Sequence, residues 1–187
     1  MTGEEICVLA ELNTEELDID RDNGLIWINQ CLLDNLPKDG KVIGTETVVT
    51  AANTLTAVTS SFLSIFEIRE SSSDVPYYGK QYGNTYGGLF DFRPGFIRMP
   101  HAGTFTITGY VIPTPMDDLD DECPVHQLFH PAIALWVASR AIRDDDETNE
   151  NGLIRRQEFF DARNRALVDL DEIMPTKPAF VRSRAWN

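Results

Sequence analysis

The sequence predicts an α+β fold, in which a mainly helical bundle carries a small antiparallel β-sheet insertion and an extended C-terminal arm. Apolar residues recur at three- and four-residue steps near both ends of the chain, as they do on the buried face of a helix. The middle, from about 41 to 112, is rich in Thr, Val, Ile and Phe, which favour strands. No periodicity remains after Pro175. We therefore expect a single domain over residues 1–174 and an arm over 175–187.

Two helices are expected before the β-region. Thr2 and Glu5 have the spacing of a capping box, in which each side chain bonds the other residue's backbone amide, so the first helix should cover about 2–12. Asp20 can cap a second helix, expected at about 20–36. The apolar stripe of that helix consists of Leu25, Ile28, Leu32 and Leu36.

The β-region, about 41–112, should consist of short strands joined by turns. Pro94 and Gly95 can occupy the two central positions of a type II turn between neighbouring strands. Residues 104–111 alternate between apolar and polar, which predicts a strand with Phe105 and Ile107 on one face. We expect the three strands around these turns to form an antiparallel meander.

A Gly- and Tyr-rich stretch precedes the predicted turn, and its composition is typical of a long loop. Tyrosine supplies a large contact area at low entropic cost, so the loop suits binding to another protein. Its candidate contact residues are Tyr77, Tyr78, Tyr82 and Tyr86.

Two more helices, at about 131–143 and 150–174, should pack as an antiparallel pair. Pro131 suits the first turn of the earlier one. The later helix is amphipathic, and Pro175 should end it. Its predicted apolar face consists of Leu153, Phe160, Leu167, Leu170 and Met174.

The charge of the chain is strongly negative and unevenly placed. Thirty acidic and sixteen basic residues give a net charge of −14, which disfavours binding to a nucleic-acid backbone. Residues 117–122 and 144–150 each hold five acids, whereas the last thirteen residues hold three bases and no acid. The chain has no long apolar run, and its first residues are acidic, so we expect a soluble protein made in the cytoplasm.

No residue pattern predicts catalysis or a cofactor. His126 and His130 are four residues apart, but Pro131 follows directly and no third ligand is evident, which disfavours a metal site. The acidic runs lack the calcium-loop pattern, and the glycine-rich loop lacks the lysine of a phosphate-binding loop. We therefore expect no enzymatic activity, cofactor or metal. Three widely spaced cysteines, Cys7, Cys31 and Cys123, indicate buried free thiols.

Several segments, in their order along the chain, resemble the head-to-tail adaptor (connector) subunits of tailed bacteriophages. They are FRPGFIRMP at 92–100, GTFTITGY at 103–110, and the helix HPAIALWVASRA at 130–141, followed by an acidic loop and a last amphipathic helix. The resemblance covers residues 20–174 in element order. It departs at 41–88, which is longer and richer in β-forming residues than in the family.

The resemblance implies an adaptor-type bundle that assembles into a homo-oligomeric ring, usually of twelve subunits. Such a ring lies in the neck of the virion, binds the portal protein and joins it to a tail or neck protein. DNA passes through its channel during genome ejection without sequence-specific binding. Assembly in the host cytoplasm, with no membrane involved, is also implied.

Two further groups of residues gain roles from the resemblance. The arm would dock on the portal through Lys177, Phe180, Arg182, Arg184 and Trp186. Acids lining the channel would keep DNA from adhering to its wall, and the candidates are Asp144, Asp145, Asp146 and Glu147. The alternatives are a phage neck or tail-completion subunit, and a small soluble ligand-binding or enzymatic domain.

Overall fold

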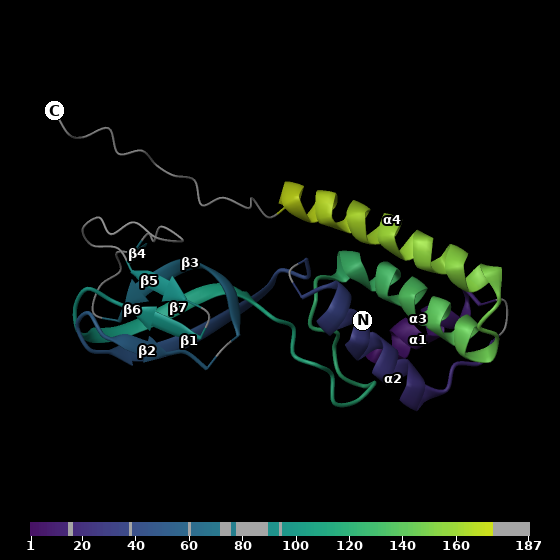
Figure 1. Ribbon diagram of the computed structural model, residues 1–187, viewed down its shortest axis with the longest axis horizontal. Coiled ribbons are helices and arrows are strands. Elements are labelled where there is room, and N and C mark those ends of the chain that lie inside the picture. Colours follow the sequence, from purple (N-terminus) through teal and green to yellow (C-terminus); the bar gives the residue numbers. More distant parts are fainter. Residues whose placement is uncertain are drawn as a thin grey trace.

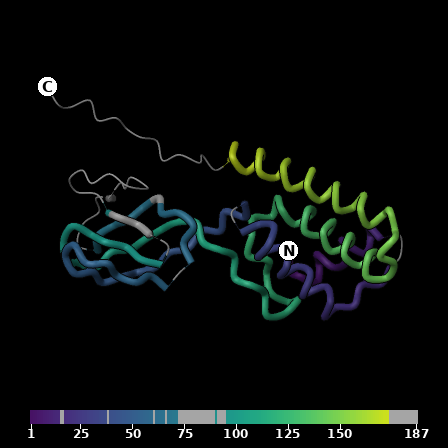
Figure 2. The backbone as a smooth tube through the Cα atoms, in the orientation of Figure 1, coloured from purple at the N-terminus to yellow at the C-terminus, as the bar shows by residue number. Residues whose placement is uncertain are grey.

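The protein consists of two parts that lie side by side along its longest axis, one helical and one built of strands (Figure 1). This computed structural model describes residues 1–14, 17–37, 39–59, 61–71, 76–77, 90–93 and 95–173. Each part has a hydrophobic core of its own. The chain crosses between the parts twice, so the β-part is formed by one continuous middle segment (Figure 2).

The helical part is built from both ends of the described chain. Its helices are α1 (Gly3–Glu11), α2 (Arg21–Gln30), a π-helical continuation (Cys31–Asn35), a short 3₁₀ turn (Gln127–Phe129), α3 (His130–Asp145) and α4 (Glu150–Ile173). The predicted capping box is confirmed: Glu5 N donates to Thr2 Oγ1 at 3.3 Å, and Thr2 N donates to Glu5 Oε2 at 3.0 Å. Asp20 caps α2 by accepting a bond from Asn23 N at 3.0 Å.

Helix α3 is the centre of the helical core, because it contacts α1, α2 and α4. Ile133 and Val137 of α3 are fully buried, and Trp136 packs against Phe159 of α4 with ring centroids 5.3 Å apart. Arg21 ties the first turn of α2 to α1 through hydrogen bonds to Glu4 and Glu11.

The predicted apolar face of α4 is confirmed in part. Leu170 is buried, Phe160 and Leu167 pack partly buried against the helical core, and Met174 lies outside the described residues. Leu153 is 55% exposed, whereas the buried positions are Gly152, Phe159, Ala166 and Leu170. A Cβ atom at Gly152 would lie 2.6 Å from Cγ of Arg143, so the start of α4 approaches α3 too closely for a larger residue. The buried side of α4 therefore includes the small residues Gly152 and Ala166, which hydrophobicity alone does not identify.

The β-part contains two antiparallel sheets. The strands are β1 (Val42–Thr50), β2 (Leu55–Ala57), β3 (Phe62–Glu70), β4 (Pro76–Tyr77), β5 (Asp91–Arg93), β6 (Phe96–Arg98) and β7 (Gly103–Val111). One sheet has the order β1-β7-β3-β4 and the other β2-β6-β5. The predicted meander is therefore wrong beyond the β5–β6 hairpin, because β7 leaves it and pairs with β1 and β3.

The predicted fold class, a mainly helical bundle with a small β-insertion, is wrong as well. The chain is α+β, and its β-part is a second packed unit instead of an appendage of the bundle. The reason is the number of apolar residues that this part buries in its own core. Phe105 and Ile107 of β7, Ile68 of β3, and Ile97 with Met99 next to it pack together there and are fully buried.

The joint between the two parts is fixed by polar contacts to the helices. Before β1, Asp39 forms an ion pair with Arg163 of α4, and Lys41 forms one with Asp171. After β7, the returning chain is held on α2, where the side chain of Asn29 bonds both the N–H and the C=O of Met116. These contacts attach both crossing segments to the helical part.

Candidate interaction surfaces

The acids predicted to line a channel lie at the tip of the α3–α4 hairpin. Asp144, Asp145, Asp146 and Glu147 are all exposed. Asp146 ends α3, and its Oδ1 accepts bonds from Thr148 N at 2.9 Å and from Thr148 Oγ1 at 2.7 Å. These bonds to Thr148 lower the pKa of the Asp146 carboxyl. The tip therefore presents its charge on a tight, internally bonded turn.

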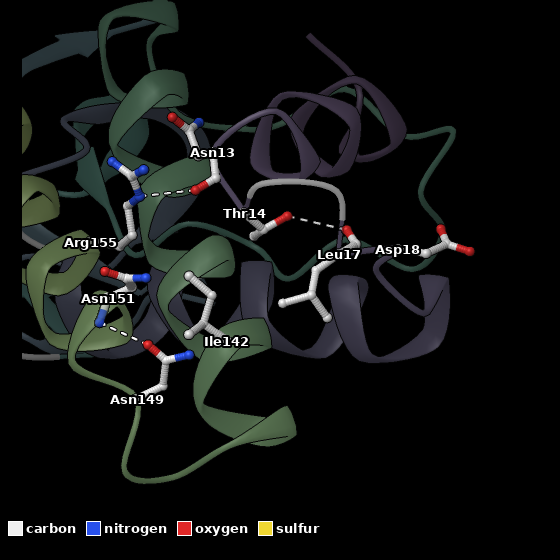
Figure 3. Close-up of a pocket in the computed structure, with 8 residues that line it drawn as sticks. All are labelled: Asn13, Thr14, Leu17, Asp18, Ile142, Asn149, Asn151 and Arg155. Carbon is white, nitrogen blue, oxygen red and sulfur yellow. Dashed lines mark hydrogen bonds between the residues drawn. The ribbon is translucent and has the colours of Figure 1, made fainter.

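A second acidic segment meets this tip, a proximity that the sequence analysis did not predict. The connection between α1 and α2 carries Asp18 and Asp20, both exposed, and lies beside the beginning of α4. Arg155 of α4 joins the two segments by donating from Nε to the carbonyl oxygen of Asn13 at 2.9 Å (Figure 3). Two acidic runs more than a hundred residues apart thus form one acidic end of the helical part.

A pocket of about 380 Å³ lies where the two segments meet (Figure 3). Its lining residues are mostly polar: Asn13, Thr14, Leu17, Asp18, Ile142, Asn149, Asn151 and Arg155. Several of these groups already bond the local backbone, as Thr14 Oγ1 does to the Leu17 carbonyl at 3.2 Å and Asn149 Oδ1 does to Asn151 N at 2.9 Å. The polar groups of the pocket thus stabilise the junction of two loops.

The other acidic run, residues 117–122, packs on the first turn of α1. Gly3 N and Glu4 N donate to the carbonyl oxygens of Asp121 and Leu119, at 3.2 and 2.9 Å. The Asp121 carboxylate in turn accepts bonds from two backbone amides of its own loop. This run caps a helix N-terminus, where negative charge is stabilised by the helix dipole.

The two histidines considered as metal ligands, and all three cysteines, have structural positions in the helical part. His126 Nδ1 accepts a bond from Leu128 N at 3.3 Å, and His130 is buried with Nε2 3.1 Å from the Val125 carbonyl oxygen. Within the described residues, no group of three or more potential metal ligands occurs. All three cysteines are buried free thiols, as predicted, and burial raises the pKa of Cys7 to about 11.

Most of the other predicted contact residues lie outside the described part of the chain. These are Lys177, Phe180, Arg182, Arg184 and Trp186 of the arm, and Tyr78, Tyr82 and Tyr86 of the loop. Tyr77 is placed in β4, opposite Ile68 of β3. The predicted roles of the arm and the loop therefore stay predictions.

One surface that the sequence analysis missed is the outer face of the four-stranded sheet. Residues directly opposite each other in an antiparallel pair share a face, so the register of β1 and β7 defines it. We call it the threonine face; its members are Ile43, Thr45, Thr47, Val49, Thr104, Thr106, Thr108 and Tyr110. None of these eight side chains carries a charge at neutral pH. On the neighbouring strand β3, Glu67 and Arg69 lie opposite Thr108 and Thr106 and extend the same face with an ion pair of 2.7 Å. The alternating threonines of residues 104–108 were the sequence feature that could have revealed it.

No protein-family model matches the chain, and a search of curated proteins finds no significant match. None of the helices in the described ranges combines the length and apolar character needed to cross a membrane.

Proposed function

We propose that this chain is a structural virion subunit that forms a ring, joins the portal to the tail and surrounds the DNA channel. The observation that carries the proposal is the division of charge between the two parts. The helical residues, 1–40 and 113–173, hold 25 acids and eight bases, whereas the β-region, 41–112, holds five of each. A strongly acidic helical part suits a channel wall, and an electrically neutral part suits contact with other subunits.

The acidic end described above fits the task of letting DNA pass. Phosphates are repelled by carboxylates, so a wall that bears Asp144, Asp145 and Glu147 would not retain the duplex as it moves. The turn that carries these residues is fixed by the hydrogen bonds of Asp146 to Thr148. The charge would therefore stay in place while DNA slides by.

Attachment to the portal is assigned in this proposal to the arm, residues 175–187. The arm holds three bases and no acid, whereas the rest of the chain is strongly acidic. Phe180 and Trp186 can supply apolar anchors. The tyrosine-bearing loop is assigned to a neighbouring tail or neck protein.

The proposal is tested by imaging the purified chain by negative-stain electron microscopy, alone and mixed with the portal protein. We expect closed rings that co-purify with the portal, and antibody labelling at the neck of intact virions. A chain that stays monomeric in both conditions, or that labels no virion, would refute the ring. Turnover of a small molecule would favour the ligand-binding or enzymatic alternative instead.

A further inference from the structure

We infer that the threonine face and the open edge of β1 form the contact between copies of this chain. The inference rests on the proposed function in one respect, because it assumes that copies assemble. It goes beyond that function by assigning the contact to one strand and one face, with a second copy as the occupant.

Within the described part of the chain, this face is uncovered and partly apolar. No described helix packs against the four-stranded sheet, and the second sheet shares the core on the opposite side. Val49 is 73% exposed and Ile43 is 50% exposed, and between them Thr45 and Thr47 are exposed too. Their partners on β7 extend the same surface across two strands. The charges on the adjoining strand, Glu67 and Arg69, pair with each other, so the face has no net charge. Burying its exposed valine and isoleucine side chains would favour association.

Among the described strands, β1 lies at the edge of its sheet, and one side of it is unpaired. In the sheet order β1 has β7 as its one neighbour, and it runs for nine residues without proline or lysine. An edge strand directs half of its backbone N–H and C=O groups away from the sheet, and proteins commonly protect such edges with charge or proline. The one charged residue of β1, Glu46, lies on the other face and accepts bonds from Thr59 N and Oγ1, at 2.8 and 2.7 Å.

The distribution of charge between the two parts favours a second copy of this chain as the partner that covers the threonine face. Two copies that met through their helical parts would bring together surfaces with 25 acids and eight bases each, and like charges repel. The β-part is the region where identical chains can meet without that cost. A strongly charged partner, in contrast, would find on this face only the Glu67–Arg69 pair, in which the charges already offset each other.

The arm of this chain is a less suitable occupant for the same reason. Beside the threonine face, the bases of the arm would find one carboxylate, Glu67, which is already paired with Arg69. The acidic end of the helical part offers many carboxylates. Docking of the arm on β1 is therefore treated as a competing outcome of the test.

The test compares two double variants of the full chain by sedimentation velocity over a range of concentrations. Thr47→Lys with Val49→Lys places two charges on the threonine face. The matched control, Ile154→Lys with Val168→Lys, adds the same charge at exposed apolar positions of α4. We expect the dissociation constant of the oligomer to rise about 100-fold or more in the first variant, because unpaired ammonium groups would be buried, and to stay near wild type in the control.

Hydrogen exchange on the wild-type chain provides a second measurement that needs no variant to fold. Amides of residues 42–50 should exchange more slowly at concentrations where the chain is oligomeric, while those of α4 should not change. Equal exchange of β1 at all concentrations in an oligomeric sample would overturn the inference.

The outcomes separate this inference from the proposed function. If the oligomer persists in the β1 variant, or if only the α4 variant dissociates, the inference is wrong. The proposed ring would then be unaffected. If deletion of residues 175–187 dissolves the oligomer and releases the β1 amides, the occupant is the arm, and the inference is wrong. A wild-type chain that never assembles, with or without portal, removes the proposed function and the inference together.

Discussion

The helical part and the β-part differ in charge more than in how they are packed. Both bury a core with fully enclosed aromatic rings, Phe129 and Phe159 in one and Phe105 in the other. Yet the helical part has an excess of 17 acids over bases, and the β-part has none. Core formation does not explain this difference, since most of the acids are exposed. The difference indicates that the surfaces of the two parts are suited to different surroundings.

The largest expected effect comes from removing one ring from each core. Phe159→Ala and Phe105→Ala should each cost about 3–5 kcal/mol, because both rings are fully buried. Since the cores are separate clusters, each loss should be felt mainly in its own part. Hydrogen exchange of the two variants should show fast amides in α3 and α4 for the first and in β3 and β7 for the second. Equal loss of protection in both parts would show that they fold as one unit.

Local features of these two parts could be predicted from the sequence, and contacts between distant segments could not. The helix caps at Thr2 and Asp20 depend on residues three positions away, and both are present. The pairing of β7 with β1 joins residues about sixty positions apart, which no local pattern specifies. The buried face of α4 was predicted in part: Leu170 was included, whereas Gly152 and Ala166 were missed because they are buried without being strongly hydrophobic.

The candidate sites divide in the same way. The acids at the α3–α4 tip were evident in the sequence as a run of charge. Their proximity to the α1–α2 connection was not, because it depends on the tertiary contact that Arg155 makes with Asn13. The threonine face needed the register of two strands before its members could be grouped. Composition identified the charged residues, and only the fold showed which of them share a surface.

The next effect in size concerns attachment through the arm. Deleting residues 175–187 should weaken binding to the portal about 100-fold, because two aromatic anchors and three charges are lost. Far-UV circular dichroism should show unchanged helices, since the described part of α4 ends at Ile173. A variant with glutamine at Lys177, Arg182 and Arg184 would show how much of the binding depends on charge and how much on the aromatic side chains. Undiminished binding of the deleted chain would assign attachment to another surface.

A smaller effect is expected when the charge of the acidic tip is reversed. Asp144, Asp145 and Glu147 are replaced by lysine, and Asp146 is retained because it holds Thr148. The chain should fold normally. Particles that carry the variant should eject DNA about tenfold more slowly, because lysines would bind the passing phosphates.

The matched control for the tip places the same three lysines on the other acidic run. Asp117, Asp120 and Glu122 are exposed, and Asp121 is retained for its backbone bonds. We expect ejection from these particles near the wild-type rate if the α3–α4 tip is the surface that faces the channel. If both variants slow ejection equally, the overall charge of the protein matters and not the position of the tip. If the tip variant ejects DNA at the normal rate, the tip acids do not face the channel and are only solvent-exposed residues of a turn.

The joint between the parts should respond modestly to loss of one ion pair. Asp39→Asn should cost about 1 kcal/mol, because the carboxylate and Arg163 are both partly buried. Asp171→Asn is the control; Asp171 is about half exposed, and its loss should cost less. Chemical denaturation monitored on the helical part would compare them. A larger effect of the Asp171 change would assign the joint to Lys41 instead.

The smallest effect is a pH dependence of the helical core alone. Burial lowers the pKa of His130 below its ordinary value near 6.5, and the N-terminal amine adds to this. The unfolded chain therefore binds a proton more readily than the folded one, so stability is complete above pH 6.5 and decreases as the pH falls below it. Between pH 7.5 and 5.5 we expect a loss on the order of 1 kcal/mol. His130→Gln should reduce this dependence, and Phe105→Ala, in the other core, should leave it unchanged.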